Sequence, residues 1–148
     1  VFNFIKLGRF IERADMLSRI IEDQILRKEN NVNKYYQNLQ WSSVLRSING
    51  FESFKLINKN NLNQEVVIKF MIMEKLFPRS LKYCVNKLLE VHKFLPKSPS
   101  IKNNISKLLK NFSSESFYIK DRKMLKLLDD FQFGLINLDK DIKDKFFN

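Results

Sequence analysis

Residues 2–27 constrain the fold most strongly, because they form one uninterrupted helical pattern. This stretch contains no proline and a single glycine, Gly8. At 100° per residue, apolar residues line one side of such a helix, and a second apolar strip lies roughly opposite. The first strip comprises Leu7, Phe10, Ala14, Leu17, Ile21 and Ile25, and the second comprises Phe2, Ile5, Met16 and Ile20. Since a helix that is apolar on two sides is normally surrounded by neighbours, we expect it inside a bundle.

The first half of the remaining chain predicts further helices. Residues 35–49 form an amphipathic pattern that Asn49 and Gly50 end as a C-cap. Residues 51–57 suggest a short apolar turn or helix. Asn63 is a good N-cap for a helix over 64–75, which is apolar nearly all round and is therefore predicted to be buried.

The second half continues in the same way. Pro78 fits the first position of a helix, where its missing N–H costs nothing. Ser100 is predicted to cap the next helix, and residues 121–146 carry a heptad-like apolar seam that requires a facing helix, by default one within the chain. Polar connections are expected at 29–34 and 113–116. The pattern predicts an all-α bundle of about five to six helices with short loops, two of them largely buried.

The net charge of +11 normally indicates nucleic acid or an anionic membrane surface as a partner. Here the 27 basic residues are mostly Lys and are scattered over every segment rather than gathered in one block. Alanine occurs once while Lys, Asn, Ile and Phe abound, a skew that AT-rich coding would produce. We therefore interpret most of the Lys residues as solvated and expect neither nucleic acid nor a membrane as partner.

Few residues are available for catalysis, and no apolar run is long enough to span a membrane. The single histidine, His92, excludes a His-based metal site or triad within the chain, and no phosphate loop or zinc spacing is present. His92 and the single cysteine, Cys84, fall on one apolar stripe, so we expect both to be structural. We predict no metal, no cofactor and no catalytic residue, and the cysteine usage favours the cytoplasm.

The middle of the first helix carries an unusual charged cluster. Arg9 and Arg13 lie one turn apart, so their planar guanidinium groups could together bind a carboxylate or phosphate, with Glu12 and Asp15 orienting them. A structural interpretation is also open, because Arg9–Glu12 and Asp15–Arg19 are helix neighbours that stabilise a helix by about 0.2–0.5 kcal/mol per pair.

Three stretches of the chain match known motifs in order and spacing. They read Leu7-Gly8-Arg9-Phe10-Ile11-Glu12-Arg13-Ala14-Asp15; Gln40-Trp41 with Leu45-Arg46-Ser47 and Phe51-Glu52; and Val66-Val67-Ile68-Lys69-Phe70-Met71-Ile72 with Phe77-Pro78-Arg79-Ser80-Leu81-Lys82-Tyr83-Cys84. Together they resemble the bacterial alpha-E domain family over residues 4–95, and more weakly beyond. The matched arginines add Arg46 and Arg79 to the candidate ligand-binding residues. The resemblance implies that residues 1–148 form a single helical domain, the C-terminal half of a longer protein of this kind.

The resemblance also implies a function. Such proteins are often encoded beside ATP-grasp ligases and transglutaminase-like peptidases, which are thus expected partners in making or modifying peptides. Since no catalytic residues are established for the family, we expect an accessory protein that recognises an anionic substrate group or scaffolds the ligase. Two alternatives remain: a basic nucleic-acid-binding bundle, and an enzyme using Glu12 and Asp15. If a first half normally covers apolar surfaces here, this chain should self-associate through them.

Overall fold

Helices form all the regular structure in the part of the chain that the computed structural model describes, residues 1–28, 33–96, 98–112 and 121–147. The predicted all-α class is confirmed, with seven helices rather than five or six, because residues 51–58 form a helix of their own. The connection predicted at 113–116 and most of that at 29–34 lie outside the described residues. The helices are α1 (Phe2–Lys28), α2 (Lys34–Ser47), α3 (Phe51–Asn58), α4 (Gln64–Met73), α5 (Leu81–His92), α6 (Pro99–Lys110) and α7 (Asp121–Phe146).

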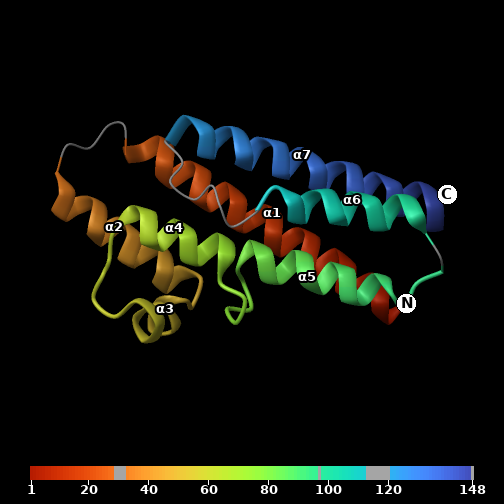
Figure 1. Cartoon of the computed structure of the whole chain (residues 1–148), viewed down its shortest axis with the longest axis horizontal. Coiled ribbons are helices and arrows are strands. Elements are labelled where there is room, and N and C mark those ends of the chain that lie inside the picture. The colour runs from red at the N-terminus through yellow and green to blue at the C-terminus, as the bar shows by residue number, and fades with distance from the viewer. Residues whose placement is uncertain (29–32, 97, 113–120, 148) are drawn as a thin grey trace.

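Four of these helices form an antiparallel bundle (Figure 1). α1 packs against α5 and α7, and α6 packs against the same two helices on the far side, so neighbours in the square run in opposite directions. α4 leads into α5, and α2 and α3 pack beside α4 near the end of α1. α1 therefore has α7 along its length, α5 beside its N-terminal half and α2 near its C-terminal end.

The predicted apolar patterns supply the core. Five of the six residues in the first strip of α1 are buried, and the α7 seam is buried throughout. The seam faces α1 and α6, so its partner is intramolecular, as expected. In α4, five of ten residues are buried, which confirms the second largely buried helix. The buried seam residues of α7 are Met124, Leu128, Phe131, Leu135, Leu138 and Ile142.

We expected neighbouring helices to cover the second apolar strip of α1 as well, and this prediction is wrong for most of the strip. Phe2, Ile5 and Met16 are more than half exposed, and only Ile20 packs against the core. α5 and α7 both contact the side of α1 that carries the first strip, so they leave the opposite side open to solvent. An apolar stripe on α1 is thus uncovered in this chain.

Two helix starts also differ from prediction. Pro78 does not begin α5: it is the second residue of a turn closed by the Ser80 amide, which donates to the Phe77 carbonyl at 3.0 Å, a position that favours proline. Ser80 instead caps α5, since its hydroxyl accepts from the Tyr83 amide at 3.1 Å. The next helix begins before Ser100, because Pro99 takes its first position and Ser98 is the N-cap.

Candidate functional site

A groove of about 550 Å³ lies where α1, the end of α2 and the turn before α5 meet. Arg9, Glu12 and Arg13 line it from α1, and Arg79 lines it from the turn. The remaining lining is mostly apolar and consists of Met16, Leu17, Ile20, Ser47 and Ile48. Four of the six residues singled out in the sequence thus meet in one place, and three of the four carry a guanidinium group.

The turn that carries Arg79 is held against α1. The Arg13 guanidinium donates to the Pro78 carbonyl over 3.3 Å, and it also lies 5.7 Å from the centre of the Phe10 ring. One edge of Arg13 therefore positions the turn. From the sequence, both an anion-binding and a structural role were open for the cluster that contains Arg13, but this contact with the turn before α5 was not predicted.

The end of α2 fixes the opposite wall of the groove. Asn49 adopts a positive φ of 54°, and the Gly50 amide donates to the Leu45 carbonyl at 2.7 Å, which is the Schellman pattern expected from Asn49 and Gly50. A Cβ atom on Gly50 would lie 2.8 Å from the Phe77 ring, so this glycine permits the close approach of the turn. The C-cap of α2 thus sets the distance between the two walls.

The charges in the groove are not balanced within the chain. Arg9, Glu12 and Arg79 are exposed, and no hydrogen bond or ion pair joins them to any of the described residues. Three arginines and one glutamate leave a formal excess of two positive charges in a partly apolar groove. Such a surface favours an anion, because guanidinium groups bind carboxylate and phosphate in a bidentate manner.

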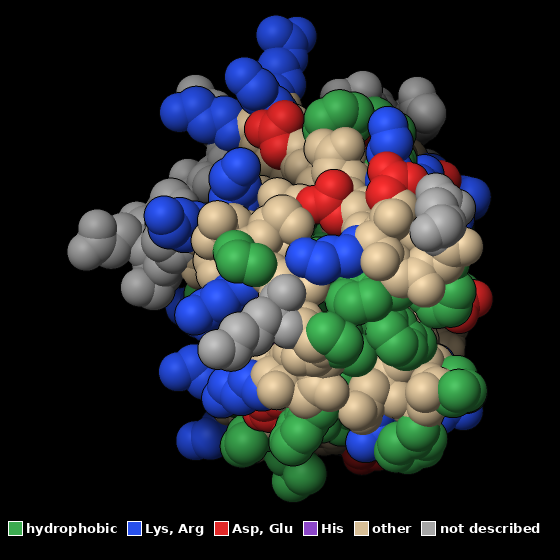
Figure 2. Space-filling model, turned by 90° about the vertical axis from the view of Figure 1, so that its right-hand side faces the viewer, with side chains coloured by type: hydrophobic (Ala, Val, Ile, Leu, Met, Phe, Trp, Pro, Cys, Tyr) green, Lys and Arg blue, Asp and Glu red, His purple; other side chains and the backbone are tan. Residues whose placement is uncertain are grey.

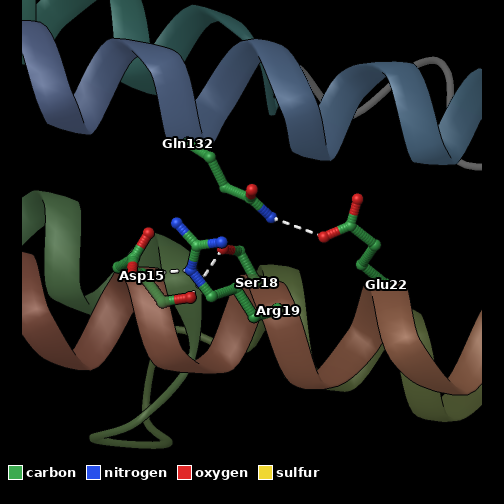
Figure 3. A network of polar contacts seen from close by, with 5 residues as sticks. All are labelled: Asp15, Ser18, Arg19, Glu22 and Gln132. Carbon is green, nitrogen blue, oxygen red and sulfur yellow. Dashed lines mark hydrogen bonds and ion pairs between the residues drawn. The ribbon is translucent and has the colours of Figure 1, made fainter.

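The structure places the other two candidates outside the groove. Asp15 accepts from the Arg19 Nε at 2.9 Å, on the side of α1 that faces α7 (Figure 3). The half-buried Glu22 accepts from Gln132 of α7 at 3.1 Å in the same region, where it ties the two helices together. Arg46 lies over the Phe51 ring, 3.9 Å from its centre, at the junction of α2 and α3.

Five groove residues were not among the candidates from the sequence: Met16, Leu17, Ile20, Ser47 and Ile48. Ser47 belongs to one of the recognised motifs, but only the neighbouring arginine, Arg46, became a candidate. Helical spacing gives the face of a residue on its own helix only, and no local signal places the end of α2 beside α1. Only the packing of α2 against α1 and α4 does so.

His92 and Cys84 have structural positions, as predicted. The His92 Nε2 lies 3.2 Å from the carbonyl oxygen of Ser98, the N-cap residue of α6, so this ring links the end of α5 to the start of α6. Cys84 is fully buried. Among the described residues no three His, Cys, Asp or Glu side chains are grouped as a metal site, and no helix has the length and apolar character needed to cross a membrane.

Burial raises the pKa of the Cys84 thiol to about 11, and the smaller opposing effect is the charge of Arg13. We expect the folded chain at pH 8 to react with iodoacetamide at least about 100-fold more slowly than the urea-unfolded chain, because two pKa units change the thiolate fraction by that factor. The rate should rise about tenfold per pH unit toward pH 11. Mass spectrometry of the alkylated protein measures it, and labelling at equal rates in both states would contradict this burial.

One family of proteins matches the chain over residues 1–147, and it is described as "a predicted alpha-helical domain with a conserved ER motif". Glu followed by Arg occurs once in the sequence, as Glu12-Arg13, and both residues line the groove. No curated protein and no solved structure matches the chain.

Proposed function

The chain belongs to the Alpha-E family, and on that premise we propose that it is a non-catalytic binding protein of a bacterial, ATP-grasp-associated system that makes or modifies peptides. In this proposal it works in the cytoplasm and binds an anionic group through Arg9, Arg13 and Arg79. The group belongs either to a peptide substrate or to the ligase that the chain scaffolds.

The observation that carries this proposal is the unbalanced charge of the groove. Two exposed arginines on different elements, Arg9 on α1 and Arg79 in the turn, face one groove without an internal acceptor among the described residues. Arg13 supports Arg79 by holding the Pro78 carbonyl, so the Glu-Arg pair contributes to the shape of the groove as well as to its charge.

A binding role fits these residues better than acid–base chemistry. An enzyme using Glu12 and Asp15 would need both carboxylates at one place, but Asp15 is engaged by Arg19 and does not line the groove. Glu12 is then a single carboxylate beside three cations. It can orient the arginines or bind an amino group of the ligand.

We expect Arg79→Lys to weaken binding of the ATP-grasp ligase encoded beside this chain by roughly tenfold, or about 1.4 kcal/mol. Lys keeps the charge but loses the planar fork that recognises carboxylates. The thermal midpoint should stay within about 1 °C, because Arg79 is exposed and unbonded within the described chain. Calorimetric titration at moderate salt measures the affinity. A peptide of three glutamates serves as a second probe, and a peptide of three glutamines is its uncharged control.

Arg122→Lys is the matched control, since Arg122 is exposed on α7 and does not line the groove. No loss in either variant would mean that net charge alone drives binding, and equal losses in both would mean that the effect is not specific to the groove. Affinity for DNA that falls steeply with salt, with no ligase complex at all, would favour the nucleic-acid alternative.

A further inference from the structure

A second groove runs along the other side of α1, between α1 and α7, with a volume of about 740 Å³. Phe4, Gly8 and Ile11 line it from α1, Ile136 lines it from α7, and Phe147 lines it from just beyond the end of α7. It begins near the end of the bundle at which both chain ends lie, and hydrophobic side chains gather on that end (Figure 2). The arginine groove lies on a different face of α1, so the two surfaces are separate.

Gly8 is the informative residue in this groove. It sits inside α1 with an ordinary helical backbone, where glycine costs roughly 0.5–1 kcal/mol relative to alanine. A Cβ atom at this position would meet nothing within 4 Å. Neither the backbone conformation nor the packing within the described chain therefore requires a glycine here. The space beside its Cα atom is open to a side chain from another molecule.

The same face also presents side chains that could fill such a gap. Ile136 is 57% exposed, although it lines the groove, and Phe147, which also lines it, is 65% exposed just beyond the end of α7. A hollow and protruding apolar side chains thus lie on one surface. An interface between two identical copies related by a two-fold axis requires this kind of self-complementarity.

The charges of the groove remove the repulsion that would otherwise keep a second copy of this basic chain away. With a net charge of +11, two copies of this chain repel each other over most of their surfaces. The α1–α7 groove is an exception, because its charged lining consists of Asp139, Lys140, Lys143 and Asp144, which sum to zero. Asp139 and Lys143 already form an ion pair at 2.9 Å, so contact here brings no net like charge together.

We infer that two copies of the chain associate through this surface, with Ile136 or Phe147 of one copy packing over Gly8 of the other. The contact places the α1–α7 face of each copy against the other and leaves both arginine grooves accessible. It does not depend on what those grooves bind.

Sedimentation equilibrium of the full chain over a range of concentrations tests this inference. We expect a monomer–dimer equilibrium in which Gly8→Leu and Ile136→Asp each raise the dissociation constant roughly tenfold or more. Ile57→Asp is the matched control, since Ile57 is 49% exposed on α3, away from the groove. The dissociation constant of this variant's dimer should be unchanged. Gly8→Ala is the second variant, because it should raise the thermal midpoint of the monomer while it weakens the dimer.

Three results would overturn the inference. The first is a wild-type chain that stays monomeric at every concentration. The second is a dimer that survives both Gly8→Leu and Ile136→Asp, and the third is one that Ile57→Asp disrupts equally, since either would locate the contact elsewhere. Circular dichroism confirms that each variant is folded before its association is compared.

Discussion

Phe77→Ala should lower the free energy of unfolding by about 3–5 kcal/mol, which corresponds to a drop in the thermal midpoint of roughly 10 °C for a chain of this size. Phe77 is buried in the turn before α5, and its ring stacks on Phe70 with centres 4.9 Å apart and planes 26° apart. Phe70 in turn meets Phe54 edge-on at 5.4 Å. Removing the last ring of this row leaves a cavity between α2, α3 and α4.

The same substitution should loosen the arginine groove. Phe77 precedes Pro78, whose carbonyl accepts the hydrogen bond from Arg13, and it fills the space that Gly50 leaves open. We therefore expect faster amide hydrogen exchange over residues 74–80 and weaker ligase binding through Arg79, even at temperatures where the variant is fully folded.

Leu76→Ala is the control, since Leu76 is adjacent in sequence but 83% exposed. It should change the free energy of unfolding by no more than about 0.5 kcal/mol, and urea unfolding followed by circular dichroism compares the two variants. A loss below about 1 kcal/mol for Phe77→Ala would mean that the ring does not support the turn in this way.

Features that depend on neighbours in sequence were predicted well. The Asn63 cap is confirmed, since its side chain accepts from the Val66 amide at 3.0 Å, and so is the C-cap at Asn49 and Gly50. The α7 seam could be identified because its spacing reports burial directly. These signals arise within one or two helical turns, where the geometry of the backbone is already fixed by the helix.

Features that depend on distant contacts were predicted poorly. Pro78 is compatible with both a helix start and a turn. In the structure it lies in a turn whose first residue, Phe77, packs against Gly50 and Phe70. Asp15 pairs with Arg19, the helix neighbour named as the structural alternative, and does not orient the arginines of the groove. Arg79 joins Arg9 only through the packing of the turn. Arg9 was a candidate because of the charged cluster in its helix, and Arg79 because of the resemblance of motifs. Neither signal indicated that the two would line one groove.

Gly134 and Leu108 should show strong energetic coupling, because Leu108 of α6 occupies the space that a side chain at position 134 of α7 would need. A Cβ atom on Gly134 would lie 2.6 Å from the Leu108 Cδ2, and Leu108 is buried and unable to move aside freely. Gly134→Ala should therefore destabilise the chain by about 1–3 kcal/mol through overpacking, although alanine is the better helix former. Leu108→Ala alone should cost about 2–5 kcal/mol through lost burial and the cavity it leaves.

In the Leu108→Ala background the effect of Gly134→Ala should change sign. The clashing atoms are then absent, the new methyl group fills part of the cavity, and the helix gains up to about 1 kcal/mol from replacing glycine. Urea unfolding of the four variants completes the double-mutant cycle, and a coupling energy near zero would contradict the close approach. Gly8→Ala provides the control, because its Cβ atom meets nothing and should stabilise the monomer equally with Leu108 or Ala at position 108. A glycine that permits packing within the chain is thereby distinguished from one whose space is left for a partner.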